Sequence, residues 1–128
     1  MTVSRLEETR LALRFFGDDL DHEAISRLLG AIPKEARTKG ETWQSRGRDV
    51  VAKTSSWILA TPHQIPGDLD GQARQLFAQL TPDLADWRSL TARYKSDLFC
   101  GLFFDGEKPG WTLTPDVEAM AEERGARL

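Results

Sequence analysis

Few residues of this 128-residue chain could carry out chemistry. Cys100 is its only cysteine, and His22 and His63 are its only histidines. A cysteine nucleophile needs a lowered thiol pKa and a base within reach. Cys100 lies inside an apolar run, where a small buried side chain is the usual occupant, and His63 is its only candidate base. We therefore predict a structural role for Cys100. A zinc site with four Cys or His ligands is excluded, because too few such residues exist.

The acidic residues at positions 18–23 suggest a second kind of chemistry, the binding of a divalent cation. A calcium loop spreads its ligands over about twelve residues, with a central glycine and a closing glutamate. Here the carboxylates are crowded into one turn: Asp18, Asp19, Asp21 and Glu23. They are better explained as a turn followed by a helix cap, since aspartate accepts the amides of a first helical turn. We predict no metal site.

Other catalytic signatures are missing from the sequence. No glycine-rich phosphate loop, dinucleotide fingerprint or nucleophile elbow occurs. A Ser/His/Asp set can be assembled from Ser55 or Ser56, His63 and Asp97, but triads are defined by geometry, and no local motif supports this one. We predict no catalytic residue and no cofactor.

The four tryptophans are the most informative residues that remain. Trp57 and Trp87 fall in apolar periodic patterns, which predicts that they pack in the core. Trp43 and Trp111 lie beside turns rich in glycine and charge, so packing explains them less well. Aromatic and arginine side chains are favoured at protein interfaces. The predicted binding residues are Trp43, Arg46, Arg48, His63 and Trp111.

These residues must be positioned by strands and helices that the hydrophobic pattern predicts. Leu11, Leu13 and Phe15 alternate with Arg10 and Arg14, which is typical of a strand with one buried face. Asp21 and Gly30 fit the start and end of a helix. In all, we expect strands over residues 9–17, 41–46, 55–61, 97–105 and 111–113, and helices over 21–30, 68–80, 81–90 and 114–125.

Residues 97–105 are apolar at both alternating sets of positions. Such a strand is either central and covered on both faces, or meets another subunit on its second face. A turn over residues 106–110 would then lead into a short return strand at 111–113. The order of elements predicts an α+β fold, with a mainly antiparallel sheet and helices packed on one face. A ferredoxin-like core with an extra hairpin strand and a C-terminal helix fits this order.

Composition limits the class of protein. The chain is 40% hydrophobic and 29% charged, so we expect one globular domain over 1–128, with 1–8 and 126–128 loosely ordered. Its net charge of −3 argues against nucleic-acid binding. We find no signal-like or membrane-spanning stretch and expect a cytoplasmic location. Residues 34–53 carry a mild basic excess, which is either a solvated face or a surface for an acidic partner.

The sequence resembles a known family at several landmarks. These are the string Leu13-Arg14-Phe15-Phe16-Gly17-Asp18-Asp19-Leu20-Asp21, the helix at 25–29, Pro33, Lys39-Gly40-Glu41, Trp57, the helix at 76–80, the strand at 97–104 and Thr112-Leu113-Thr114-Pro115. In this order they are similar to the domain-of-unknown-function 4279 family, over roughly residues 10–122. The resemblance implies a small cytoplasmic protein of a chiefly bacterial family, and it supplies no catalytic residue.

Two functions remain from these observations. The first is a non-catalytic cytosolic module that binds a protein partner or its own second copy, of which a toxin-neutralising immunity protein is one form. The alternative is a small-molecule-binding protein or enzyme with a pocket near Trp43, His63, Asp97 and Trp111.

Overall fold

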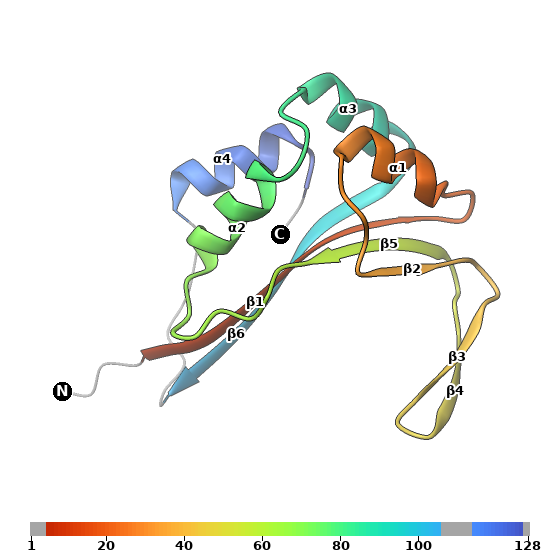
Figure 1. The fold of residues 1–128 in the computed structure, drawn as a ribbon, viewed down its shortest axis with the longest axis horizontal. Helices are drawn as coiled ribbons and strands as arrows, with labels where there is room; N and C mark the ends of the chain where they lie inside the picture. The colour runs from red at the N-terminus through yellow and green to blue at the C-terminus, as the bar shows by residue number, and fades with distance from the viewer. Residues whose placement is uncertain (1–4, 106–113, 127–128) are drawn as a thin grey trace.

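The computed structural model of the chain describes residues 5–105 and 114–126 (Figure 1). Its elements are β1 (Arg5–Gly17), α1 (His22–Leu29), β2 (Glu35–Arg37), β3 (Thr42–Ser45), β4 (Arg48–Val51), β5 (Ser55–Ala60), α2 (Leu69–Ala78), α3 (Leu84–Arg93), β6 (Lys95–Asp105) and α4 (Pro115–Glu123). The predicted α+β class is confirmed. None of the described helices is long and apolar enough to span a bilayer.

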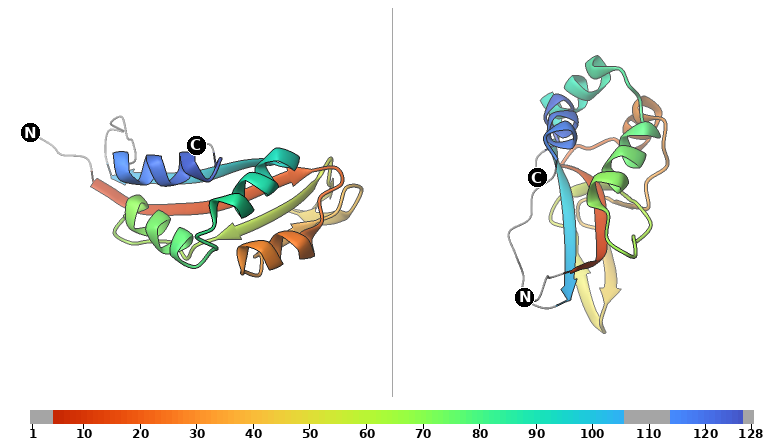
Figure 2. Two further views of the ribbon diagram at one scale, coloured as in Figure 1. Left: turned by 90° about the horizontal axis from the view of Figure 1, so that it is seen from above. Right: turned by 90° about the vertical axis from the view of Figure 1, so that its left-hand side faces the viewer.

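The main sheet has four strands in the order β2-β5-β1-β6, and every neighbouring pair is antiparallel. With α1 after β1 and α2 and α3 before β6, this is the predicted ferredoxin-like arrangement. The two central strands face each other at Phe15 and Trp57, and β1 meets β6 at Leu11 and Cys100. The helices lie together on one face of the sheet (Figure 2).

The core lies between that face and the helices. Leu11, Leu13 and Phe15 are at most 1% exposed, as their alternation predicts. Trp57 and Trp87 are fully buried, which confirms their predicted core role, and both rings pack against Phe15. Their indole N–H groups donate to the Ser26 hydroxyl and the Thr81 carbonyl, so neither ring buries an unpaired donor.

Capping residues set the helix ends. The Asp21 carboxylate accepts the Ala24 amide at 3.1 Å, and Gly30 ends α1 with a φ of 79°, both as predicted. The helix expected from residue 81 begins later, at Leu84. The N-cap of α3 is Asp83. Thr81 does not cap the helix, because its hydroxyl accepts the Asp83 amide and donates to the Asp86 carboxylate.

Two strands form where the sequence did not predict them. β2 lies in a segment expected to be a polar loop, and it is held by His22, whose Nε2 lies 2.9 Å from the carbonyl oxygens of both Arg37 and Ser56. β4 pairs with β3 in a separate two-stranded hairpin. Its turn places Arg46 and Gly47 at positive φ, the geometry of a two-residue hairpin loop.

Residues 97–105 were expected to form either a central strand or a strand that meets another subunit on its second face, and among the described residues the strand is not central. β6 lies at the border of the sheet, and Phe99 and Phe103 are 50% and 44% exposed on the face without helices. Apolar residues on both faces indicate two covered faces, but here only the helix side is covered among the described residues. The predicted return strand at 111–113 lies outside the described residues. β1 begins at Arg5, earlier than predicted.

The β3–β4 hairpin gives the molecule an angular shape. It leaves the sheet at the end where β1 finishes and points away from the helices (Figure 1). The helix-free side of the sheet and the hairpin therefore form the two walls of an angle.

Candidate functional site

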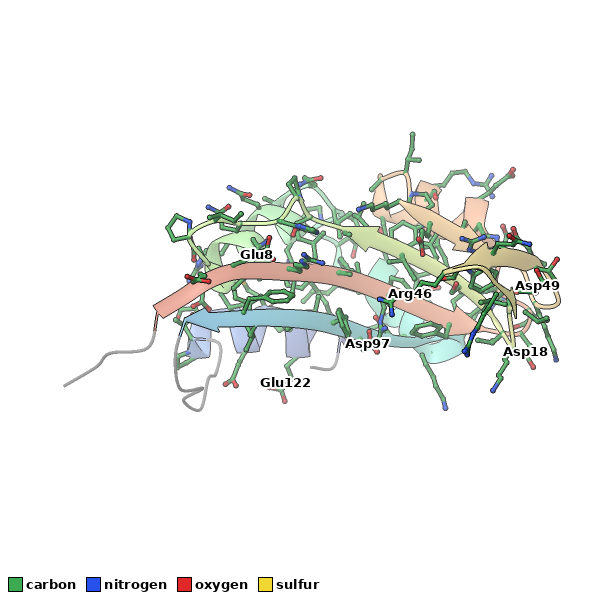
Figure 3. The ribbon with its side chains drawn as sticks, turned by 90° about the horizontal axis from the view of Figure 1, so that it is seen from below. Glu8, Asp18, Arg46, Asp49, Asp97 and Glu122 are labelled. Carbon is green, nitrogen blue, oxygen red and sulfur yellow. The ribbon has the colours of Figure 1, made fainter. Side chains whose placement is uncertain are left out.

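The candidate site is the sheet face opposite the helices, which we call the open face (Figure 3). Since Leu11, Leu13 and Phe15 point into the core, the alternate residues of β1 and their register partners on β5 and β6 point to this face. Its members are Glu8, Arg10, Ala12, Arg14 and Phe16 of β1, Ser56, Ile58 and Ala60 of β5, and Asp97, Phe99, Gly101 and Phe103 of β6.

Arg14 lies at the centre of the open face in a fixed orientation. Its Nε and Nη2 atoms each donate to a different carboxylate oxygen of Asp97 at 2.7 Å. The guanidinium carbon lies 5.2 Å from the Phe16 ring centroid and 4.9 Å from that of Phe99. The hydrogen bond with Asp97 raises the pKa of Arg14. Two-pronged pairing and stacking together hold a planar cation in place.

The same arrangement recurs on both sides of Arg14. The Arg10 guanidinium lies 4.8 Å from the Phe103 centroid and 3.2 Å from a Glu8 oxygen. At the hairpin, the Arg37 guanidinium lies 4.1 Å from the Trp43 centroid, and Glu41 lies 3.7 Å from its Nη1. Each arginine thus stacks on an aromatic ring and pairs with a carboxylate.

The structure brings together only some of the predicted binding residues. Trp43, Arg46 and Arg48 share the hairpin. His63 lies near the start of β1, where its Nδ1 is 3.5 Å from Glu8. Trp111 lies outside the described residues.

One pocket therefore does not hold both Trp43 and His63. Trp43 stacks on Arg37. Arg37 is the register partner of Ser56, and Ser56 is the register partner of Phe16 near the end of β1. His63 is instead beside Glu8, at the other end of β1. At about 3.3 Å per strand residue, these ends are roughly 26 Å apart. The third residue named for that pocket, Asp97, accepts two hydrogen bonds from Arg14.

The clefts in the described part of the molecule include three of about 610, 460 and 440 Å³, and none of these three is lined by Trp43, His63 or Asp97. The largest of these three lies between α3, β6 and α4, and its lining includes Lys95, Ser96 and Glu122. These three clefts therefore do not correspond to the pocket expected from the sequence.

Cys100 lies on the helix side of β6 and is partly buried. Burial, with a smaller effect of Asp97, raises the pKa of its thiol to about 11. A thiol that stays protonated at neutral pH is a poor nucleophile. This environment supports the structural role predicted for Cys100.

The predicted binding residues did not include Arg10, Arg14, Phe99 or Phe103. For β1 the signal was present, because any residue that alternates with the buried Leu11 and Leu13 must face the other way. The pairing of Arg14 with Asp97 had no local signal, since 83 positions separate them.

Comparison with known proteins identifies the family of this chain. A family model described as a domain of unknown function, DUF4279, matches residues 7–128. No curated protein and no solved structure matches the chain. The match spans nearly the whole chain, and its range includes residues 13–21 and Trp57. The chain belongs to the DUF4279 family.

Proposed function

We propose that this protein is a non-catalytic module that binds another protein through its open face and its β3–β4 hairpin. The observation that carries the proposal is the row of ordered arginines on this side of the molecule, with Phe99 and Phe103 half-exposed among them. Arginine and aromatic side chains supply most of the binding energy at protein interfaces. Side chains that are already ordered lose less entropy when a partner binds.

The charges favour a protein partner over a nucleic acid. Arg10, Arg14 and Arg37 each lie within 4 Å of a carboxylate, from Glu8, Asp97 and Glu41 respectively. These carboxylates would repel a phosphate backbone, whose binding depends on cations that replace counterions. A protein partner can instead present both acidic side chains to the arginines and basic side chains to the carboxylates.

The hairpin supplies the second wall of the site. Arg46 and Arg48 are exposed near its tip, and Val51 is 55% exposed. A partner seated in the angle would be contacted from two directions. The small, acidic α+β chain supports one specific form of the proposal, a cytoplasmic protein that neutralises its partner in the manner of an immunity protein.

Affinity capture from the source organism tests this proposal. The wild type is compared with Phe99→Ser and Arg14→Ala on the open face, and with Arg88→Ala on the exposed side of α3. We expect a stoichiometric partner with the wild type and with Arg88→Ala, and at least about tenfold weaker binding for the open-face variants, whose truncated side chains are interface anchors. Equal capture by all four proteins, or no stoichiometric partner, would overturn the proposal.

A further inference from the structure

The β3–β4 hairpin has two faces of different charge. Ser45 is the register partner of Arg48, and Gln44 is that of Asp49. Side chains alternate along a strand, and residues opposite each other in a pair share a face. Arg48 therefore lies on the same face as Ser45 and Trp43, and Asp49 lies on the other face with Gln44. Asp49 is the only carboxylate of the two strands, so the face with Trp43 carries positive charge alone.

The positive face of the hairpin is turned toward the open face of the sheet. Arg37 is the register partner of Ser56, and Ser56 is that of Phe16, so Arg37 lies on the same side of the sheet as Phe16. The Trp43 ring stacks on the Arg37 guanidinium at 4.1 Å. We therefore call the face with Trp43 and Arg48 the inner face of the hairpin.

Three exposed cations lie where the inner face meets the open face: Arg46, Arg48 and Lys95. Lys95 is the register partner of Phe16, so it lies on the open face at the end where the hairpin leaves the sheet. Among residues 5–105 and 114–126, none of the three has a carboxylate within 4 Å. The whole chain has a net charge of −3, so positive charge is concentrated here and complements an acidic partner.

Arg46 adds an observation of a different kind. Its φ of 52° is in the left-handed region, where the first position of a two-residue hairpin loop favours asparagine or glycine. A larger side chain there costs free energy, because its Cβ crowds the following carbonyl oxygen. Viewed from the open side, Arg46 projects over the sheet beside Asp97, so the tip of the hairpin overhangs the open face (Figure 3). Strain kept at such a position points to a role in binding.

This angle is built from described residues. Lys95 begins β6 and Asp105 ends it, so the two are roughly 33 Å apart at about 3.3 Å per residue. Asp105 is the register partner of Arg5, and Thr114 donates to Asp70 at the start of α2. The two residues that flank positions 106–113 are therefore both at the end of the molecule away from the hairpin (Figure 1).

We infer that the angle between the inner face and the open face binds one acidic segment of the partner protein. Arg46, Arg48 and Lys95 contact its carboxylates, and the partly buried rings of Phe16 and Trp43 contact apolar side chains between them. The inner face is four residues long, roughly 13 Å, which matches the width of a single helix or extended segment. The inference rests on the proposed function, since it names the chemistry of the partner at that surface.

A short labelled peptide of Glu-Glu-Leu repeats is the probe, and its counterpart with Gln in place of Glu is the control. Fluorescence anisotropy of the peptide, with the full chain added, measures binding. We expect saturable binding that weakens as salt is added, and binding at least about tenfold weaker for the Gln peptide. No saturable binding of the acidic peptide, or equal binding of both peptides, would overturn the inference.

Charge reversals locate the binding. Arg48→Glu and Lys95→Glu should each weaken binding of the acidic peptide at least about tenfold, because each places a like charge against it. Lys95 lies outside the hairpin, so its effect does not depend on how the hairpin folds. Arg88→Glu makes the same change of charge on the exposed side of α3 and should leave the affinity within about twofold. An equal loss with Arg88→Glu, or no loss with Lys95→Glu, would overturn the inference.

Arg46→Asn tests the tip of the hairpin. Asparagine suits the turn and removes the charge, so the variant should keep the hairpin and bind the acidic peptide about threefold more weakly, as expected for one exposed ion pair. Binding equal to that of the wild type would contradict the role inferred for Arg46.

Two outcomes separate this inference from its alternatives. Tighter binding of an oligothymidylate than of the acidic peptide would show a nucleic-acid surface and overturn the inference. A chain that captures a protein through Phe99 and Arg14 but does not bind the acidic peptide would refute the acidic segment alone. Peptide binding that Lys95→Glu abolishes, with no partner captured from the source organism, would support the acidic preference and refute only the stoichiometric partner.

Discussion

At the scale of single residues, Arg14 links two strands through one side chain. We expect Arg14→Ala to lower the free energy of unfolding by about 1 kcal/mol, since a partly exposed ion pair and its stacking contribute modestly. Urea unfolding measures this, and a double-mutant cycle with Asp97→Asn isolates the pair. Arg14→Lys is the control: it keeps the charge but loses the two-pronged geometry, so it should recover only part of the loss. Full recovery by lysine would show that the geometry does not matter.

Cys100 gives a second prediction at this scale. Because burial holds its pKa near 11, alkylation by iodoacetamide at neutral pH should be about 300-fold slower in the folded than in the unfolded chain. The protonated thiol stabilises the fold fully below the unfolded thiol pKa of about 8.5. That contribution is lost as pH rises from there through about 11. Rapid alkylation at pH 7 would contradict this environment.

At the scale of elements, Gln72 joins α2 to β1 and to the loop after β5. It is 2% exposed, accepts from the Thr9 hydroxyl, and donates to Thr9 O, Thr61 Oγ1 and Pro62 O. Gln72→Leu leaves the Thr9 hydroxyl without its acceptor and the Pro62 carbonyl without its side-chain donor, and it should cost about 2 kcal/mol in urea unfolding. Gln75→Leu, at an exposed position of the same helix, should change stability by less than about 0.5 kcal/mol. Equal effects would mean that the buried network is not stabilising.

The β3–β4 hairpin is an insertion between β2 and β5 that contributes nothing to the main core. The Ala52 amide donates to the Glu41 carbonyl, the bond that closes a two-residue loop, so an Asn-Gly turn can replace Thr42–Val51. We expect this excision to change the free energy of unfolding by less than about 1 kcal/mol, because only surface contacts are lost. Partner capture should fall. A large loss of stability in thermal or urea unfolding would show that the hairpin supports the sheet.

The elements differ in how far sequence alone predicts them. α1 was predictable because Asp21 and Gly30 mark its ends locally, and β1 because its alternation is regular. β2 was not, since three residues with exposed or partly exposed side chains carry no hydrophobic pattern. It exists because His22 and the adjacent β5 provide hydrogen bonds from elsewhere in the chain.

At the scale of the whole molecule, the α+β class and ferredoxin-like order followed from the sequence, but the position of β6 did not. A pattern reports which faces of a strand are apolar, and it does not report how many neighbours the strand has. Likewise, Trp43, Arg46 and Arg48 lie together because they are close in the chain. The rest of the open face depends on long-range pairing.

Stability should be distributed unevenly over the molecule. β1 is bonded on both sides and covered by helices, whereas β3 and β4 pair only with each other in the described structure. Amides of β1 should exchange only with global unfolding, and those of β3 and β4 by local opening. Hydrogen exchange with mass spectrometry checks this, and hairpin protection equal to that of β1 would contradict it.

The pairing of β1 with β6 also has a consequence for biosynthesis. Leu11 leaves the ribosome long before its register partner Cys100. At about 5–20 residues per second, the delay is on the order of ten seconds. During that time the apolar side of β1, with Leu13 and Phe15, lacks its final neighbour. A nascent chain that stalls before β6 would therefore be a substrate for chaperones or proteases. Stable folding of β1 thus requires the last third of the protein to be synthesised.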